Sequence, residues 1–444
     1  GMKELLLDGP VSPGEEISNR ARKQFMDRAG EISEVYREQV YRGFSGEAAT
    51  LSIQDILALI GRSIALLDDS ITANRRPDGL YHSYNLLQMA EEGCGVEHLQ
   101  EMLEGQVAVL SSGVLKPEQC FDLLNSLHTS DLFRPDQNSY ILYPAPALPG
   151  FLEKNLIDPG LAAASDLVQA EQEAGRTDFI EQDVKGRYHF NGRFRNAGEL
   201  KKALEEERDL GVDTIAGACD LFEQVFSHRR FTGRSGAMYK YEGLGCIYWH
   251  MVSKLLLALA EILPGVPAEQ ADLRSGLLRH YDQVKQSLGA HKNPADYGAF
   301  PMDPYSHTPA FAGVQQPGMT GQVKEDFISR MAELGVQVRK GQIGFFPVYL
   351  KRNEFSRAAE RWHFMTEGED RTEELPPDSL AFCICGVPVI YRLQGSACIR
   401  VYQQGEPVLQ LEGTTLPKEL SRSLFRRDNR IYKIEVSVSA DQLR

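Results

Sequence analysis

Long apolar runs, secretion signals and nucleotide-binding fingerprints are missing from this sequence. No apolar stretch reaches the ~20 residues that a membrane-spanning helix needs, and the longest candidate, Leu255 to Leu263, is short. The residues after Gly1-Met2-Lys3 contain no apolar signal region. Neither a Rossmann glycine fingerprint nor a P-loop occurs. These absences predict a cytoplasmic protein with no membrane partner and argue against a nucleotide-driven enzyme.

Positive charge is also in short supply. The 444 residues include 48 Lys and Arg against 62 Asp and Glu, which gives a net charge of −14. An acidic chain has no overall attraction for phosphate backbones, so we expect no nucleic-acid partner. The seven cysteines are odd in number and scattered, which favours reduced thiols over a disulfide framework. No residue pattern indicates a metal, nucleotide or redox cofactor.

Helical periodicity dominates residues 15–340. Apolar residues recur at spacings of three and four from Ile53 to Leu67, which predicts a helix with one buried face. Similar stripes predict helices at 102–110, 119–127, 162–170, 199–209, 212–226, 273–288 and 323–334. Turns rich in Gly, Pro, Asn and Asp separate these helices, and no strands occur at βαβ spacing. We therefore expect residues 1–340 to form an all-α domain.

The pattern changes after Gly335. Residues 343–350, 380–393, 397–402, 407–411 and 430–438 form short segments rich in β-branched and aromatic residues, bounded by turn formers. Helices followed by strands predict two packed domains in sequence rather than one α/β sheet. We expect the second domain, residues 341–444, to be an antiparallel β-sandwich.

A first polar cluster runs from Met238 through Glu242 to Trp249 and His250, at the start of a predicted helix. His250 lies off the apolar stripe of that helix. A lone histidine on a helix is more often structural than functional. The aromatic residues on both sides of the glycine-rich approach at Glu242 favour a functional interpretation.

A second cluster occupies the loop 301–321, which contains Asp303, Tyr305 and Gln316. Loops of this length inside a compact domain are usually functional or disordered, and the aromatic and small residues argue against disorder. Thr320 is the expected N-cap of the next helix. Backbone N–H groups at a helix start attract anions, and Gly321 would let one approach closely. A plain N-cap that faces water is the alternative.

A third cluster runs from Asp78 through Tyr81 to Asn85, and a predicted helix from Gln106 to Gly113 follows it. Aromatic rings with amide and hydroxyl neighbours suit the stacking and hydrogen bonding of a sugar ring. They equally suit an interhelical loop packed against the core.

In this order the clusters resemble the catalytic region of the cellobiose and chitobiose phosphorylase family of inverting glycoside phosphorylases. Asp78–Tyr81 and Gln106–Gly113 resemble the family's Gly-Trp-Tyr stretch and its Gln-Ser-Trp-Ala-Val-Leu-Ser-Gly helix. The stretch from Glu242 to His250 is similar to Glu-Asn-Gly-Gly-Gln-Tyr-Thr-His, and Asp303-Pro-Tyr305 resembles Glu-Pro-Tyr. The resemblance implies an (α/α)6 toroid of the six-hairpin glycosidase type, followed by a β-rich domain.

The resemblance also implies residue roles. Inorganic phosphate, as co-substrate, would replace the attacking water of an inverting glycosidase, and a carboxylic acid would protonate the departing oxygen of an oligosaccharide. Three residues would hold the phosphate, namely His250, Thr320 and Gly321. Glu242 would bond sugar hydroxyls or act in catalysis. The remaining positions would bind or shape the sugar: Tyr81, Trp249, Asp303, Tyr305 and Gln316.

The family's general acid lies in an Asp-Trp-Asn-Asp stretch that residues 1–77 do not contain. An insertion at about 130–235 could supply a replacement, Asp183, or extra phosphate donors such as Arg193 and Arg195. It could equally be a solvated β-hairpin without a role. We therefore expect phosphorolysis or hydrolysis of a glycosidic bond. The alternatives are a non-catalytic sugar-binding module or the C-terminal part of a larger enzyme, and the oligomeric state has no signature.

Overall fold

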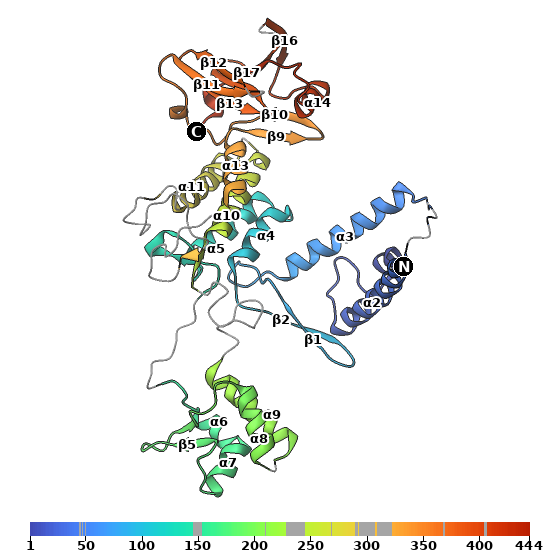
Figure 1. Cartoon of the computed structure of the whole chain (residues 1–444), viewed down its shortest axis with the longest axis vertical. Coiled ribbons are helices and arrows are strands. Elements are labelled where there is room, and N and C mark those ends of the chain that lie inside the picture. Colours follow the sequence, from blue (N-terminus) through green and yellow to red (C-terminus); the bar gives the residue numbers. More distant parts are fainter. Residues whose placement is uncertain are drawn as a thin grey trace.

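The computed structural model describes most of the chain. The described residues are 1–444 without 44, 45, 47, 49, 145–152, 209, 228–244, 268, 289–291, 293–306, 309–321, 367–368 and 404–405. Figure 1 shows a central helical region, an insertion at one end, the C-terminal β-rich part at the other, and N-terminal helices to one side. None of the helices described here is both long and apolar enough to cross a bilayer.

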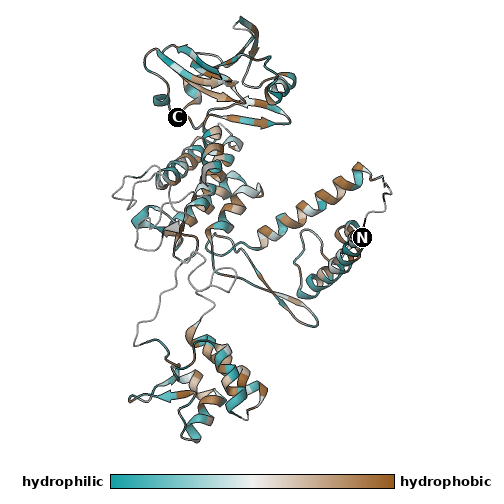
Figure 2. Ribbon diagram, in the orientation of Figure 1, coloured by the Kyte–Doolittle hydropathy of each residue, from teal (hydrophilic) through white to brown (hydrophobic). Residues whose placement is uncertain are grey.

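The N-terminal region is extended. Its elements are α1 (Met2–Asp8), α2 (Asn19–Arg42), α3 (Ile53–Ala73), β1 (Leu86–Met89) and β2 (Cys94–Glu97). The helix predicted from Ile53 is confirmed, but its predicted burial is wrong: Ile53 is 74% exposed, and α3 has no buried residue. The helix α1, which packs against α3, is too short to cover its apolar stripe, visible in brown in Figure 2.

The central region is built around one apolar helix. Its helices are α4 (Leu103–Ser112), α5 (Pro117–Thr129), α10 (Trp249–Ile262), α11 (Ala271–Ser287) and α13 (Gln322–Glu333). Apolar residues on several sides of α10, including Val252, Leu255 and Leu259, are buried, so this helix can pack against α4, α11 and α13 together. The helices predicted in this region are confirmed within a few residues.

Short β-pairs connect the loops of the central region. Two strands, β3 (Phe133–Arg134) and β4 (Ser139–Tyr140), pair antiparallel, as do β7 (Ile247–Tyr248) and β8 (His307–Thr308). Each pair fixes segments that carry polar residues beside the helical core.

The insertion has its own hydrophobic core. Its elements are α6 (Pro159–Ala163), α7 (Asp166–Glu173), β5 (Ile180–Gln182), β6 (Tyr188–Phe190), α8 (Ala197–Glu207) and α9 (Val212–Phe226). Phe179, Phe190 and Phe222 are buried within this core. The single helix predicted at 162–170 is divided into α6 and α7, because Ser165 caps a new start by accepting a hydrogen bond from Val168 N at 3.4 Å.

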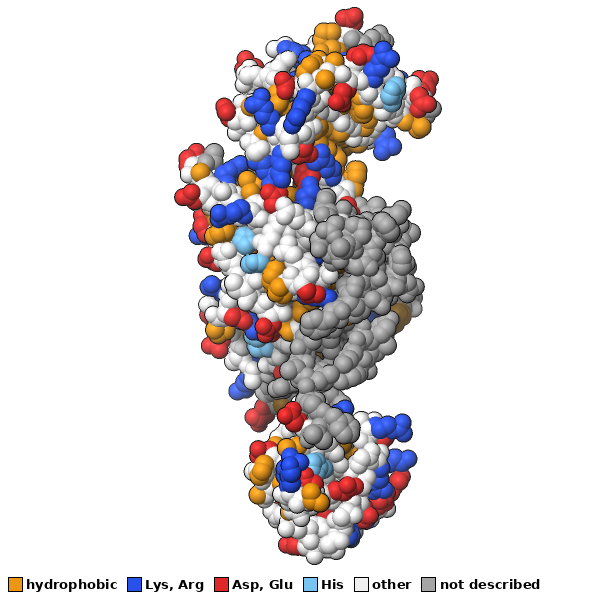
Figure 3. Space-filling view, turned by 90° about the vertical axis from the view of Figure 1, so that its left-hand side faces the viewer, with side chains coloured by type: hydrophobic (Ala, Val, Ile, Leu, Met, Phe, Trp, Pro, Cys, Tyr) orange, Lys and Arg blue, Asp and Glu red, His pale blue; other side chains and the backbone are white. Residues whose placement is uncertain are grey.

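The C-terminal domain begins with the hairpin β9 (Val336–Arg339) and β10 (Gln342–Phe345) and continues with β11 (Glu360–Thr366) and β12 (Glu369–Leu375). A larger sheet follows, made of β13 (Ser379–Ile384), β14 (Val387–Leu393), β15 (Cys398–Gln403), β16 (Glu406–Glu412) and β17 (Lys433–Val438), with α14 (Lys418–Arg426) before the last strand. In Figure 3, acidic and basic side chains are intermixed over this domain and over the insertion.

The larger sheet has five strands in the order β13-β14-β17-β15-β16. We expected antiparallel strands only, but β14 and β17 are parallel. The connection through α14 returns the chain to the middle of the sheet, so β17 runs in the same direction as β14. The (α/α) toroid and the two-sheet sandwich stay predictions.

Gly335 ends α13 and starts the C-terminal domain. Its φ of +75° is in the left-handed region, which suits a glycine after the last helical turn. Its carbonyl accepts a hydrogen bond from Phe346 N at 2.7 Å, and a Cβ here would lie 2.1 Å from the Phe346 carbonyl carbon. The hydroxyl of Tyr391 donates to the carbonyl of Leu334. These contacts join α13 to the sheet.

Candidate functional site

Two of the predicted polar clusters meet at the first turn of α10. The strand β7, at the end of the first cluster, pairs antiparallel with β8, which lies within the loop of the second cluster. Tyr248 pairs with His307 and directly precedes α10. Tyr248 is also the N-cap, and its own side chain makes no capping hydrogen bond. The backbone N–H groups of the first turn of α10 therefore receive no hydrogen bond from the side chain of Tyr248.

His250 is held between two elements. Its Nε2 atom lies 2.9 Å from Oε1 of Glu325 on α13, and its Nδ1 atom lies 3.3 Å from the hydroxyl oxygen of Tyr248. Glu325 is only 3% exposed, and Lys324 Nζ lies 3.6 Å from the same oxygen. Because a carboxylate oxygen accepts hydrogen bonds, we assign the hydrogen of this contact to Nε2. Both ring nitrogens of His250 thus have partners.

The helix α13 buries several polar side chains. Glu325, Ser329 and Glu333 recur at a spacing of four and are buried, whereas Phe327 is 66% exposed. The helix predicted at 323–334 is confirmed. Of its predicted apolar face, Leu334 is buried and Met331 packs against the C-terminal core, whereas Phe327 is exposed. Glu325 was not found by sequence reasoning. The only sequence signal was its position five residues after Thr320, near the expected anion seat.

Glu333 shows how a carboxylate on this face is satisfied. It accepts hydrogen bonds from the Tyr281 hydroxyl at 2.6 Å, from Arg330 at 2.7 Å and from Lys285. Burial acts to raise the pKa of Glu333, but these three donors outweigh it and the pKa is lowered. Glu333 is therefore an ionised structural carboxylate that joins α13 to α11.

Tyr81 and Trp249 belong to the central hydrophobic core. Trp249 is 0% exposed, Tyr81 is buried, and burial raises the pKa of its hydroxyl. The amide of Gln106 holds the backbone of Tyr81 through two hydrogen bonds of 2.9 Å. These rings can shape a cavity through packing, but a fully buried indole has no face free for stacking on a sugar. Their direct contact with substrate stays a prediction.

Asp183 lies at the turn between β5 and β6, so the hairpin considered for the insertion is present. Its carboxylate accepts hydrogen bonds from Arg187 N and Lys185 N, and from the guanidinium of Arg187. These bonds lower the pKa of Asp183 far below its usual range. The hydrogen bond from Arg187 N contributes most, and His189 is among the weaker contributors. These bonds favour the ionised form of Asp183, whereas a general acid must carry a proton, and the role of replacement general acid stays a prediction.

The remaining predicted positions lie outside the described residues: Glu242, Asp303, Tyr305, Gln316, Thr320 and Gly321. The helix α13 starts at Gln322, two residues after Thr320, so it begins one residue later than the predicted N-cap at Thr320 requires. Residues close to them in the sequence do lie together. The pairing of β7 with β8 and the contact between His250 and Glu325 both occur at the start of α10.

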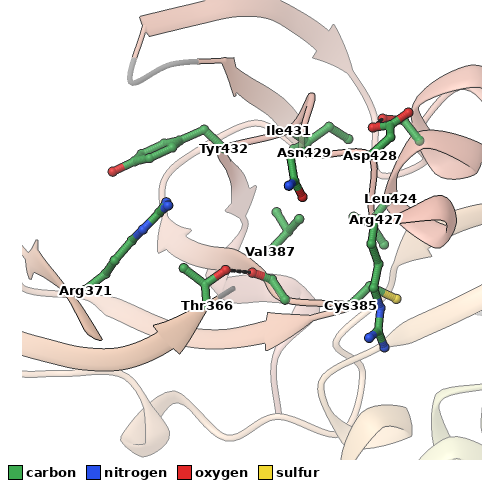
Figure 4. Close-up of a pocket in the computed structure, with 12 residues that line it drawn as sticks. Thr366, Arg371, Cys385, Val387, Leu424, Arg427, Asp428, Asn429, Ile431 and Tyr432 are labelled. Carbon is green, nitrogen blue, oxygen red and sulfur yellow. Dashed lines mark hydrogen bonds between the residues drawn. The ribbon is translucent and has the colours of Figure 1, made fainter. Parts of the chain in front are cut away.

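A separate pocket of about 230 Å³ occurs in the C-terminal domain (Figure 4). Its lining comes from β11, β12, the turn before β14 and the segment that leads from α14 to β17. Arg371, Asn429 and Tyr432 form part of its polar wall, and Thr366 donates a hydrogen bond to the carbonyl of Gly386 at 2.5 Å. None of the residues predicted from the sequence lines this pocket.

A comparison with protein-family models matches residues 148–229 to GH149 phosphorylase insertion domain 2. The matched range coincides with the insertion that has its own hydrophobic core. A search of curated proteins found no match. The match supports a relation between this chain and the glycoside phosphorylases, but it names GH149 rather than the cellobiose and chitobiose phosphorylases.

Proposed function

We propose that this protein is a glycoside phosphorylase-like enzyme that cleaves oligosaccharides with inorganic phosphate by an inverting mechanism. The observation that carries the proposal is the match of residues 148–229 to an insertion domain of GH149 phosphorylases. In the chain, this insertion lies directly before the segment that contains Trp249 and His250. An (α/α) toroid followed by a β-sandwich remains the architecture that we propose for the two domains.

The meeting point of α10, α13 and β7–β8 supports an anion site. In the proposed reaction, phosphate held by His250, Thr320 and Gly321 attacks the anomeric carbon and forms a new C–O bond. The glycosidic C–O bond breaks, and a carboxylic acid gives its proton to the departing oxygen. The products are a sugar 1-phosphate and a shortened sugar. Glu242 is the remaining carboxylate among the predicted catalytic residues, since Asp183 is held in its ionised form.

The proposal is tested by incubating the protein with α- and β-linked disaccharides and short oligosaccharides, with and without inorganic phosphate. Sugar 1-phosphate and free sugar are measured separately. We expect sugar 1-phosphate only when phosphate is present. Free sugar at a rate independent of phosphate would indicate hydrolysis and would contradict the anion site.

Three variants assign roles within this assay. Loss of the proton donor typically costs ~10²–10⁴-fold in rate, so we expect a loss of this order for Glu242→Gln. His250→Ala should raise the KM for phosphate. Asp183→Asn is the matched control, because its carboxylate serves the β5–β6 turn, and we expect its turnover to stay near that of the wild type. A large loss of turnover in Asp183→Asn would contradict the assignment of this carboxylate to the β5–β6 turn.

A non-catalytic sugar-binding module is the second candidate. The ionised state of Asp183 favours it, because this position was the proposed substitute for the missing general acid. It predicts saturable oligosaccharide binding by calorimetry with no cleavage under any phosphate concentration. Detection of sugar 1-phosphate would exclude it. The C-terminal part of a larger enzyme stays a third prediction.

A further inference from the structure

The feature that the proposed function does not explain is the polar face that α13 buries against its neighbours. Helices normally bury apolar residues, yet here Glu325 and Ser329 are buried while Phe327 is exposed. Departures from hydrophobic patterning are expected at functional sites. On this face, Glu325 forms a hydrogen bond with α10, and its partner there is His250.

We propose that Glu325 is a positioning residue for an anion-binding His250. It accepts the Nε2 hydrogen of the imidazole and thereby turns Nδ1 toward the bound phosphate. The identity of the anion rests on the proposed function, whereas the orientation of the imidazole does not.

The contrast with Glu333 supports a functional role. Both glutamates are buried on the same face of α13, two turns apart. Glu333 accepts hydrogen bonds from three donors, and two of these bonds join α13 to α11. In Glu325, Oε1 contacts His250 and Lys324, whereas Oε2 is buried without a hydrogen-bond partner among the described residues. Buried carboxylates with a purely structural role are normally satisfied more fully.

The interface around Glu325 has further unused hydrogen-bonding capacity. In the described part of the chain, the hydroxyls of Ser253 on α10 and Ser329 on α13 are buried and have no partner. Ser253 follows His250 by one turn, and Ser329 follows Glu325 by one turn. The two helices pack against each other, and each carries a buried hydroxyl one turn after its member of the His250–Glu325 pair.

The geometry of His250 suits an exchange of partners at Nδ1. The Nε2 contact is short, at 2.9 Å, and its acceptor is a carboxylate. The Nδ1 contact with the Tyr248 hydroxyl is longer, at 3.3 Å. A protonated imidazole that keeps its bond to Glu325 can donate Nδ1–H to a phosphate oxygen. Such a charge-assisted bond is stronger than the one to a neutral hydroxyl. Tyr248 then acts as the partner of Nδ1 while no anion is bound.

The experiment uses two readouts on the full chain. The first is calorimetric titration with inorganic phosphate. The second is ¹⁵N NMR of histidine-labelled protein without phosphate, with the His250 signals assigned by their loss in His250→Ala. The variants are Glu325→Leu, which removes the acceptor, and Glu325→Gln, which retains a neutral acceptor. Glu333→Gln is the matched control on the same helix face.

We expect Glu325→Leu to weaken phosphate binding about tenfold or more, as the loss of a hydrogen bond to a charged group predicts. We expect it also to change the ¹⁵N signature of His250 from Nε2-protonated to a mixture. Glu325→Gln should keep part of the phosphate affinity and part of the Nε2-protonated signature. Glu333→Gln should change neither the affinity nor the signature. A His250 signature that is unchanged in Glu325→Leu would overturn the proposal, as would an equal loss of binding in Glu333→Gln.

The two proposals fail differently. If the wild type does not bind phosphate but its His250 signature depends on Glu325, the proposed function is wrong and the positioning role stands. If the wild type binds phosphate and the signature is insensitive to Glu325, the positioning role is wrong and the proposed function stands.

Discussion

The side-chain amide of Gln106 spans the backbone of Tyr81, accepting a hydrogen bond from its N–H and donating one to its carbonyl, each at 2.9 Å. The same amide donates to the carbonyl of Met102 at 3.1 Å. Gln106 on α4 is completely buried, so water cannot replace these bonds. One side chain therefore ties the segment before α4 to the central core.

Replacing Gln106 with Leu should destabilise the protein by about 2–4 kcal/mol, because the buried N–H and carbonyl of Tyr81 lose their partners. Urea unfolding measures the change. Gln88→Leu is the control, since Gln88 is exposed and bonds only to an exposed glutamate among its described neighbours. Equal unfolding midpoints for the two variants would contradict the structural role of Gln106.

The buried carboxylate of Glu333 should make stability depend on pH. Its pKa in the folded protein is lowered from the ordinary value of 4.5, so its contribution is complete above about pH 4.5 and is lost as the pH falls through the folded value. We expect Glu333→Gln to cost about 3 kcal/mol at pH 7, since it breaks a buried charge network. The difference from the wild type should shrink as the pH falls below 4.5. Unfolding midpoints measured from pH 7 to pH 3.5 check this, and a constant difference would contradict it.

Gly335 should not tolerate a side chain. A Cβ there would meet the backbone of Phe346, in addition to the cost of a positive φ. We expect Gly335→Ala to cost more than about 2 kcal/mol by thermal or urea unfolding. Gly341→Ala is a matched control, because its φ of +76° is nearly the same but its Cβ would meet nothing within 4 Å. The difference in unfolding free energy between the two variants therefore measures the clash of the new Cβ with the backbone of Phe346. Equal values for the two variants would contradict the described end of α13.

The insertion should respond to core mutations by itself. Phe222 packs against Phe190 and Phe226 inside the core of the insertion. We expect Phe222→Ala to destabilise this core by about 3–5 kcal/mol. Hydrogen exchange should then increase within 157–226 and stay unchanged within α10 and α11. Val184→Ala, at a fully exposed turn position, is the control and should change neither region. Increased exchange in α10 would show that the two cores are coupled.

The sequence predicts helices better than it predicts what they face. The range 212–226 matches α9 residue by residue, because apolar spacing and turn formers determine where a helix lies. The same spacing at Ile53–Leu67 predicts a buried face, but burial also requires a partner of sufficient size. The strands β11 and β12 were missed because β12 consists mostly of charged residues, and most positions of both strands are exposed or only partly buried.

The roles assigned to the residues of the candidate site stay predictions. The position of His250 beside the helix that follows Thr320 and Gly321 agrees with the order of the clusters. Glu325 was overlooked, because a charged residue in a helix is normally placed on the solvent side. The hydrogen bonds that hold Asp183 ionised come from its own turn, and no residue count or spacing reveals them. Local geometry therefore decides which carboxylates can take part in proton transfer.

The position of β17 also sets an order of events during synthesis. This strand lies between β14 and β15, so both neighbours are made before the strand that joins them. Until residues 433–438 leave the ribosome, β13–β14 and β15–β16 can form only as separate hairpins with unpaired edges. A stalled nascent chain that ends before Lys433 should consequently be vulnerable to proteolysis and to pairing with other chains. Completion of the last strand would pair the facing edges of β14 and β15 in one step.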